Sequence, residues 1–416
     1  MKVFKFGGAS VKDIGGVKNV LQVLEAEGTA EKLVVISAMG KMTNALEVVV
    51  NDYLQKGSFN DALQPVKEFH REIMLGLFEN REHPAFVAVR HLFDALENFL
   101  RHNRSTNYDF VYDQVVIYGE LLSTTIVSSY LSSCGIKNDL LDARNCIRTD
   151  NTYRDAQVHW EETQAQIISL VRRVNLSITQ GFIGADPNNF STTLGREGSD
   201  YTAGIFAYCL NAESVTIWKD VPGVLNADPR VFDNAQLLEH ISYEEAIELA
   251  FYGASVIHPK TLQPLQRKEI PLYVKSFLNP VNPGTAVKKG QPILPKIPCF
   301  IVKKNQVLIS LSSLDFSFIL EKNISEIFDL FHKYQIKVDL IQNSAISFSV
   351  CIDNKFNNLE KLLSHLKATF RVNYNTGVSL YTIRHFDEKA VAGLEKDKKV
   401  LLKQITRETV QLVAIP

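Results

Sequence analysis

Apolar and polar positions along residues 1–275 follow two alternating patterns, short β-branched runs and longer stretches with helical spacing. Alternation of strands with helices favours an α/β fold with an open, mostly parallel sheet and helices on both faces. Such sheets bind ligands beyond the carboxyl ends of their strands. The predicted strands are Lys2–Phe6, Leu33–Ser37, Asp139–Leu141, Ser177–Gln180, Ser214–Trp218 and Pro271–Ser276. The predicted helices are Val11–Ala26, Asn44–Leu54, a long stretch Asn60–Phe99, Gln114–Ser132, Trp160–Val174, Ser199–Leu210 and Tyr243–Tyr252.

A passage rich in proline and glycine, from Asn279 to Pro298, breaks this rhythm and marks a domain boundary. The order β-α-β-β-α-β that follows is the ferredoxin-like arrangement. A second piece after it is too short for another complete copy. The ferredoxin-like elements are Val307–Leu311, Ile324–Tyr334, Lys337–Gln342, Ile346–Ile352, Leu359–Leu366 and Thr369–Asn373, and the second piece has a strand at Val378–Arg384, a helix at Glu388–Gln404 and a strand at Thr409–Ile415.

Composition excludes several classes of protein. The chain has 416 residues, 45% hydrophobic content and a net charge of -1, which describe a globular protein without the basic field that attracts nucleic acid. Its five cysteines are odd in number and contain no Cys-x-x-Cys pair, so they are expected to be the reduced thiols of a cytoplasmic protein. The sequence shows neither a secretory signal nor an apolar run of roughly 18 residues, so we expect no membrane partner.

The first candidate for chemistry is Lys5-Phe6-Gly7-Gly8-Ala9-Ser10. A lysine in a strand and two glycines at its end bring a cation, a flexible turn and free backbone N–H groups together, which suits a bound phosphate. A lysine in a sheet covered on both faces also needs an anion. An ordinary strand followed by a glycine turn is the alternative.

The second candidate is the segment from Thr192 to Ala203, where glycines and hydroxyls lead into a helix whose first turn holds Ser199 and Asp200. Arg196 and Asp200 offer a cation and an anion to one ligand, as an amino acid requires. The alternative is a capped helix start with a local Arg–Asp pair. The third candidate, Trp218 to Arg230, ends a buried strand in charged residues and a Pro-Gly turn, which is typical of a nucleotide lip or of a structural turn.

Together, in this order, these segments resemble the aspartokinases of the amino-acid kinase family. Lys5–Ser10 is similar to that family's opening Lys-Phe-Gly-Gly-Thr-Ser, and Ser37–Asn44 to its Ser-Ala-Met-Gly-x-x-Thr-Asp/Asn loop. Gly119-Glu120 and the run from Tyr252 to Pro259 also match. The resemblance implies a catalytic domain at residues 1–285, an ACT-like domain at 300–375 and a partial second ACT-like unit at 376–416.

By this resemblance, the reaction is ATP-dependent phosphorylation of L-aspartate to 4-phospho-L-aspartate, the first step towards lysine, threonine and methionine. Mg²⁺ would bridge the ATP phosphates, with no protein ligand identified. The implied catalytic residues are Lys5 and Asp200. The implied aspartate-binding residues are Thr43, Glu120, Arg196 and Asp200, and the implied ATP-binding residues are Lys5, Gly7, Gly8, Ser37, Lys219, Asp220, Leu225, Arg230 and Ser255.

The chain departs from the family pattern at several of these positions. Ser255 replaces a lysine that contacts nucleotide, and Lys260 is a candidate substitute. Glu197 stands where a small residue is usual and Lys219 where a threonine is common. These changes affect nucleotide affinity more than reaction type.

The ACT-like region implies a homo-oligomer and a lysine or threonine effector. Its effector loop, Ser312–Ser317, lacks the expected glycine, and Gln342–Ala345 departs from the usual Thr-Ser-Glu, so the sequence leaves feedback control open. Two other functions also stay open, a kinase of this fold acting on another small acid such as glutamate and a non-catalytic amino-acid sensor.

Overall fold

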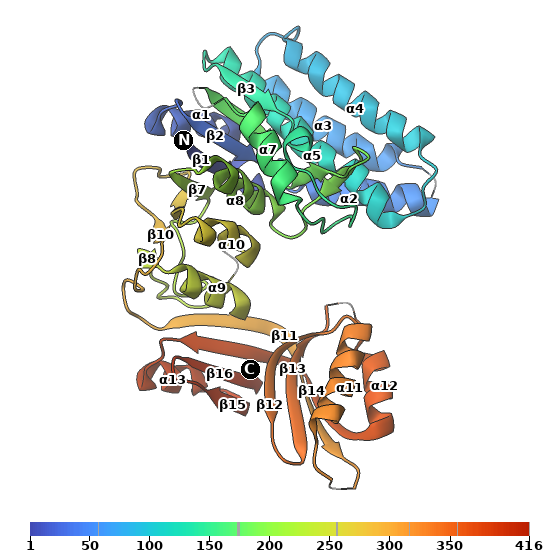
Figure 1. The fold of residues 1–416 in the computed structure, drawn as a ribbon, viewed down its shortest axis with the longest axis vertical. Helices are drawn as coiled ribbons and strands as arrows, with labels where there is room; N and C mark the ends of the chain where they lie inside the picture. Colours follow the sequence, from blue (N-terminus) through green and yellow to red (C-terminus); the bar gives the residue numbers. More distant parts are fainter. Residues whose placement is uncertain (57, 173–174, 255–256, 316, 356, 416) are drawn as a thin grey trace. The chain divides into compact units, whose positions relative to one another are not determined.

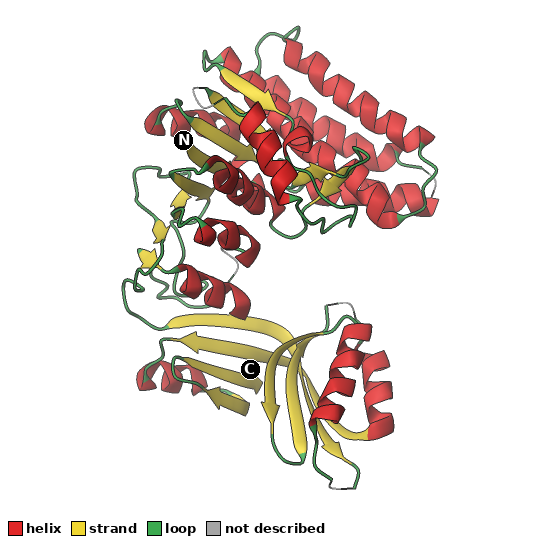
Figure 2. Ribbon diagram, in the orientation of Figure 1, coloured by secondary structure: helices red, strands yellow, loops and turns green. Residues whose placement is uncertain are grey.

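The computed structural model describes residues 1–416 except 57, 173–174, 255–256, 316, 356 and 416. The described chain forms two compact units. Unit 1 contains residues 1–224, 237–247 and 256–294, and unit 2 contains residues 225–236, 248–255 and 295–416. Figure 1 labels many of the elements of both units, and Figure 2 distinguishes their helices from their strands by colour.

Unit 1 is built on one eight-stranded sheet in the order β3-β4-β2-β1-β7-β9-β10-β8. The first six of these pair in parallel, and β10 runs antiparallel to β9. The predicted mostly parallel sheet is therefore confirmed. The strands are β1 (Lys2–Phe6), β2 (Lys32–Ile36), β3 (Asn138–Leu141), β4 (Leu176–Gln180), β7 (Ser214–Lys219), β8 (His240–Ile241), β9 (Leu272–Ser276) and β10 (Thr285–Val287), beside a separate two-stranded ribbon of β5 (Ile183–Ala185) and β6 (Ser191–Thr193).

Helices lie on both faces of this sheet (Figure 2). The long stretch predicted over Asn60–Phe99 is two helices, because His83 before Pro84 is extended, with φ -55° and ψ 134°, as proline requires of the residue before it. The helices of unit 1 are the 3₁₀ turn η1 (Gly8–Val11), α1 (Ile14–Glu27), α2 (Met42–Lys56), α3 (Asn60–Leu77), α4 (Pro84–His102), α5 (Tyr108–Ser133), α6 (Ala143–Cys146), α7 (Trp160–Leu170), α8 (Gly198–Leu210) and α10 (Pro259–Arg267), and α9 (Tyr243–Tyr252) begins in unit 1 and ends in unit 2.

The long helix α5 is the central helix of unit 1. It is long and apolar enough to cross a membrane, but most of it is buried inside the unit. It packs against α2 and α4 on one side and against strands of the sheet on the other. A helix that is apolar on all sides is typical of a protein core, so α5 is a core helix.

Unit 2 contains a six-stranded antiparallel sheet in the order β12-β13-β11-β14-β16-β15. The predicted β-α-β-β-α-β order appears as β11, α11, β12, β13, α12 and β14. The elements of this unit are β11 (Cys299–Ser313), α11 (Glu321–Lys333), β12 (Lys337–Asn343), β13 (Ser347–Asp353), α12 (Leu359–Thr369), β14 (Phe370–Arg384), α13 (Glu388–Glu395), β15 (Lys399–Ile405) and β16 (Thr409–Ile415).

The helix predicted over Glu388–Gln404 is wrong in its second half. Helix α13 ends at Glu395, Asp397 adopts a left-handed conformation with φ +63°, and Lys399–Ile405 forms strand β15 paired with β16. The first half of β11 pairs with the second half of β14, which joins β16, so this half of the sheet has four strands. The pairing comes from residues far away in sequence, which local spacing does not reveal.

Candidate active site

A pocket of about 320 Å³ lies at the carboxyl ends of β1, β2, β4 and β7. Strand β1 lies at the point where the order of the sheet reverses, with β2 on one side and β7 on the other, which is where open α/β sheets bind ligands. The pocket is lined by Lys5, Gly8, Ser37, Ala38, Gly40, Thr43, Glu120, Phe182, Gly195, Glu197, Gly198, Ser199, Asp200 and Lys219.

Lys5 enters the pocket because side chains alternate along β1. Phe4 and Phe6 point to the other face, where their rings lie 5.7 and 6.1 Å from the ring of Trp218. The Lys5 Nζ atom lies 2.6 Å from Oδ1 of Asp200, and the Nζ atom of Lys219 lies 3.6 Å from Oδ2. The lysine therefore has the anion that its burial requires.

Asp200 lies in the first turn of α8 and is almost completely buried. Burial by itself would raise the pKa of this carboxyl, but the positive charges of Lys5 and Lys219 outweigh it and hold the pKa below its usual value. Asp200 therefore stays ionised at neutral pH and orients two ammonium groups in the pocket.

The glycines after β1 let two backbone segments meet. A Cβ atom at Gly8 would lie 2.8 Å from the carbonyl oxygens of both Ala38 and Gly40, so no other residue fits there without a shift of the backbone. The Gly40 N–H donates to the Gly8 carbonyl oxygen at 3.0 Å. Gly7 lies beside the Lys5 amine, since a Cβ atom there would be 3.3 Å from Nζ. These contacts place the backbone of the two loops close to the Lys5 ammonium.

Glu120 is fully buried on α5 and faces the same pocket as Thr43. Its Oε1 accepts the Ala38 N–H at 3.3 Å, and among the described residues its Oε2 has no hydrogen-bond partner. Burial raises the pKa of Glu120 to about 8, although the Ala38 N–H opposes this shift. A buried carboxyl with one unsatisfied oxygen is suited to bind a cationic group of a ligand.

The loop before α8 supplies Gly195, Glu197, Gly198 and Ser199 to the pocket. Glu197 adopts a left-handed conformation with φ +53°, and burial raises the pKa of its carboxyl. Its Oε2 has no hydrogen-bond partner among the described atoms. Arg196, by contrast, is exposed and is not among the residues that line the pocket.

The predicted site residues are not all brought together. Asp220 follows β7, is exposed and does not line the pocket. Leu225 and Arg230 belong to unit 2, where Arg230 pairs with Asp228 at 2.8 Å, and Ser255 lies outside the described residues. Lys260, the candidate substitute for the missing lysine, forms an ion pair with Asp155.

Phe182 is a pocket residue that the sequence analysis missed. It follows β4 with a left-handed backbone, φ +71°, and its N–H donates a hydrogen bond to the Thr202 hydroxyl oxygen at 2.9 Å. The sequence did contain a signal, because Gly181-Phe182 directly follows the predicted strand Ser177–Gln180 and strand ends of a parallel sheet meet at one edge.

The described residues contain no group of three or more histidine, cysteine, aspartate or glutamate side chains arranged to hold a metal ion. Mg²⁺ usually binds proteins through one or two carboxylates together with substrate phosphates. Asp200 and Glu197 are the carboxylates beside the pocket's lysines, and Glu197 retains an unpartnered oxygen. The site therefore fits an ion that arrives with phosphates and does not form a cage for a free one.

The chain is similar to known proteins over most of its length. Residues 1–276 match the model of the amino acid kinase family. Lysine-sensitive aspartokinase 3 of Escherichia coli is 31% identical over 409 residues, which cover 95% of this chain and 89% of that protein.

Two solved structures of E. coli aspartokinase III, each 28% identical, cover all of this chain and are themselves 96% covered. The complex with lysine and aspartate, described as the T-state, gives a TM-score of 0.83. The complex with aspartate and ADP, described as the R-state, gives 0.80. The similarity thus spans both units.

Proposed function

The chain belongs to the amino acid kinase family and within it to the aspartokinases, and on this basis we propose that its pocket transfers the γ-phosphoryl group of ATP to L-aspartate. One observation supports this most directly. Two lysines paired to a buried aspartate lie in the same pocket as a buried glutamate with an unsatisfied oxygen. Such a pocket offers positive charge to a phosphate and a carboxylate to an ammonium group.

Lys5 is proposed to stabilise the phosphoryl group during its transfer. In the reaction, a side-chain oxygen of aspartate forms a bond to the γ-phosphorus, and the bond from that phosphorus to the bridging oxygen of ADP breaks. The transition state is loose and is stabilised chiefly by positive charge and alignment. Asp200 holds the Lys5 ammonium in place, while Gly7, Gly8 and Ser37 are proposed to lie near the phosphates.

The substrate carboxylate needs no general base, because it is ionised near pH 7. We assign Thr43, Glu120, Arg196 and Asp200 to the aspartate end, with Glu120 opposite the substrate ammonium. Arg196 is exposed, so its proposed role is to bind the α-carboxylate from the rim of the pocket through its guanidinium fork.

Lys219 is proposed to neutralise nucleotide charge from within the pocket. Four further residues are proposed to bind the nucleotide on the resemblance alone: Asp220, Leu225, Arg230 and Ser255. When bound with the nucleotide, Mg²⁺ would neutralise phosphate charge, and Asp200 and Glu197 are the carboxylates that could hold it.

We further propose that the aspartokinase domain spans residues 1–285, followed by ACT-like units at 300–375 and 376–416 that join subunits of a homo-oligomer. Unit 2 contains a second pocket, of about 310 Å³, whose lining includes Ser310, Asn343 and Ser344. E. coli aspartokinase III has been solved with lysine, so an amino-acid effector is proposed for this unit. A cytoplasmic location is proposed on the family's biosynthetic role.

The deciding experiment is an assay of ADP release and hydroxamate formation with ATP, Mg²⁺ and a panel of amino acids. We expect turnover with L-aspartate. Preferred phosphorylation of glutamate would show that glutamate is the substrate in place of aspartate. Binding of amino acids without ADP release would indicate a sensor. Separate titrations with lysine and threonine would then identify an effector by inhibition.

A further inference from the structure

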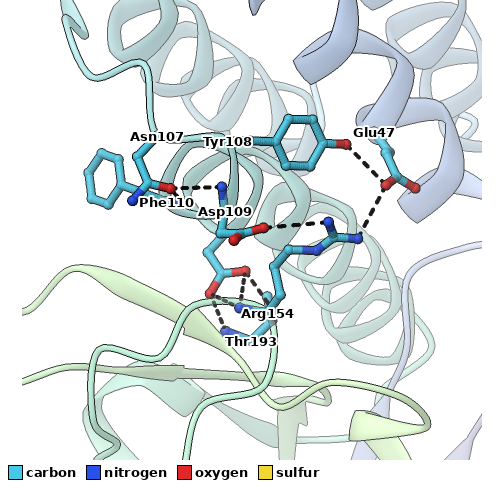
Figure 3. A network of polar contacts seen from close by, with 8 residues as sticks. Glu47, Asn107, Tyr108, Asp109, Phe110, Arg154 and Thr193 are labelled. Carbon is cyan, nitrogen blue, oxygen red and sulfur yellow. Dashed lines mark hydrogen bonds and ion pairs between the residues drawn. The ribbon is translucent and has the colours of Figure 1, made fainter. Parts of the chain in front are cut away.

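Arg154 lies outside the pocket lining but contacts two helices that carry pocket residues. Its guanidinium lies between carboxylates of α2 and α5, with nitrogen atoms 3.5 Å from oxygens of both Glu47 and Asp109 (Figure 3). The same group lies 4.3 Å from the ring centroid of Tyr112 and 5.3 Å from that of Tyr108. Charge pairing and cation–π contacts therefore hold this side chain across α2 and α5.

The backbone of Arg154 is also held, through a hydrogen bond to the side chain of Asp113. This buried carboxylate accepts the N–H of Arg154 at 3.0 Å, the N–H of Thr193 at 2.8 Å and the Thr193 hydroxyl at 2.7 Å. Burial raises the pKa of Asp113 to about 6, and these hydrogen bonds oppose that shift. Asp113 thereby joins the segment that carries Arg154 to strand β6.

The elements joined in this way are those that carry the proposed aspartate end of the pocket. Glu47 lies one turn after Thr43 on α2, and Asp113 lies two turns before Glu120 on the same face of α5. Thr193 immediately precedes Leu194 and the loop that begins at Gly195.

Gly195 itself rests against the Arg154 segment. Its φ is +77°, and a Cβ atom there would lie 3.2 Å from the Arg154 carbonyl oxygen. A shift of this segment would therefore be transmitted to the loop that leads into α8, whose first turn carries Asp200. Arg154 has a left-handed backbone, φ +69°, which costs a non-glycine residue about 1 kcal/mol.

We propose that Arg154 is a positioning residue that braces α2, α5 and the Gly195 loop and thereby sets the affinity for the amino-acid substrate. The inference rests on the proposed function, since it names the residue that holds the proposed aspartate-binding side chains in position. Arg154 touches neither substrate nor nucleotide in this scheme. It acts through Glu47, Asp113 and the loop.

The test uses the whole 416-residue chain and three variants of it. Arg154→Gly removes the side chain and relieves the left-handed backbone, so its Tm should not fall. The KM for aspartate should rise about 5- to 20-fold, with kcat and the KM for ATP within about twofold of wild type. Arg154→Lys keeps the charge but lacks the planar guanidinium, so it should recover part of the affinity. Glu269→Gly, at another exposed left-handed residue with an ion pair, is the control and should change none of these values.

An unchanged KM for aspartate in Arg154→Gly would overturn the inference. The proposed function would still stand if the wild-type protein phosphorylates aspartate. Equal rises in both KM values together with a lower Tm would also overturn it, because they indicate a purely structural role. Wild-type protein that releases no ADP with aspartate would overturn the proposed function and this inference together.

Discussion

The Lys5 Nζ atom and the Asp200 Oδ1 atom lie 2.6 Å apart, although the two residues are far apart in the sequence. Strand β1 supplies the lysine and the first turn of α8 supplies the carboxylate. A charge-assisted pair of this length fixes the direction of the lysine side chain. It prepares a positive charge at the carboxyl edge of the sheet before any ligand binds.

Lys5→Ala should therefore abolish turnover, lowering kcat by about 10³-fold or more because charge stabilisation at the phosphoryl group is lost. The fold should persist, since Lys219 still faces Asp200. Coupled ADP-release kinetics and thermal unfolding measure the two effects. Lys18→Ala, on the exposed face of α1, is the matched control and should behave as wild type. Near-normal rates in Lys5→Ala would remove the catalytic role.

Aspartate binding should depend on pH through Glu120. The pKa of this carboxyl is raised to about 8 by burial, so below pH 8 the free protein holds a proton there. Binding of the substrate ammonium requires the ionised form, so binding must release that proton. Affinity should consequently weaken as pH falls from about 8 to 6, by at most about tenfold per unit.

Calorimetry at pH 7 in buffers of different ionisation enthalpy measures this release directly, and close to one proton per aspartate is expected. Glu120→Gln should bind aspartate more weakly and release none. Aspartate binding by the wild type with no proton exchange, or with proton uptake, would contradict the assignment of Glu120 to the ammonium.

Arg196→Ala tests a residue that the pocket lining does not include. If the arginine binds the α-carboxylate from the rim, its loss should raise the KM for aspartate about tenfold and leave kcat within about twofold. Steady-state kinetics at saturating ATP provide the measurement, with the exposed Arg104→Ala as control. An unchanged KM would make Arg196 a surface residue without a role in binding.

The sequence predicted the six longer strands of the main sheet well, because most of them are local apolar runs that end at turns. The prediction for Lys2–Phe6 agrees with β1 at both ends, and the sequence indicates both Lys5 and Asp200 as site residues, which the structure brings into contact. The two-residue strand β8 and the ribbon of β5 and β6 were too short to give a periodic pattern. Lys399–Ile405 is a strand and not the predicted helix because it pairs with β16, and local residue spacing does not reveal this pairing.

The site was less predictable where one residue acts through another. Arg154 lies in an irregular segment, and its partners Glu47 and Asp109 are 107 and 45 positions away in sequence. Nothing in the local sequence indicates that they meet. Phe182, in contrast, directly follows a predicted strand and could have been found from the rule that strand ends of a parallel sheet converge.

The last prediction concerns Glu197, which places a buried carboxyl in the pocket beside Asp200. Its left-handed backbone costs about 1 kcal/mol, which Glu197→Gly should recover as stability. Burial raises the pKa of Glu197, so the folded state binds its proton more strongly than the unfolded state does. Ionisation of this carboxyl therefore destabilises the fold as pH rises above about 4.5, and the gain in Tm should be larger at pH 8 than at pH 4.

Removing this carboxylate should also raise the KM for ATP, by about threefold, because the Mg²⁺ bound with the nucleotide would lose one of its proposed protein partners. Glu197→Gln separates the two effects, since it keeps the strained backbone and removes only the charge. It should reproduce the higher KM for ATP without the stability that comes from relief of the backbone. A lower KM for ATP in both variants would instead show that the carboxylate repels the triphosphate and takes no part in holding Mg²⁺.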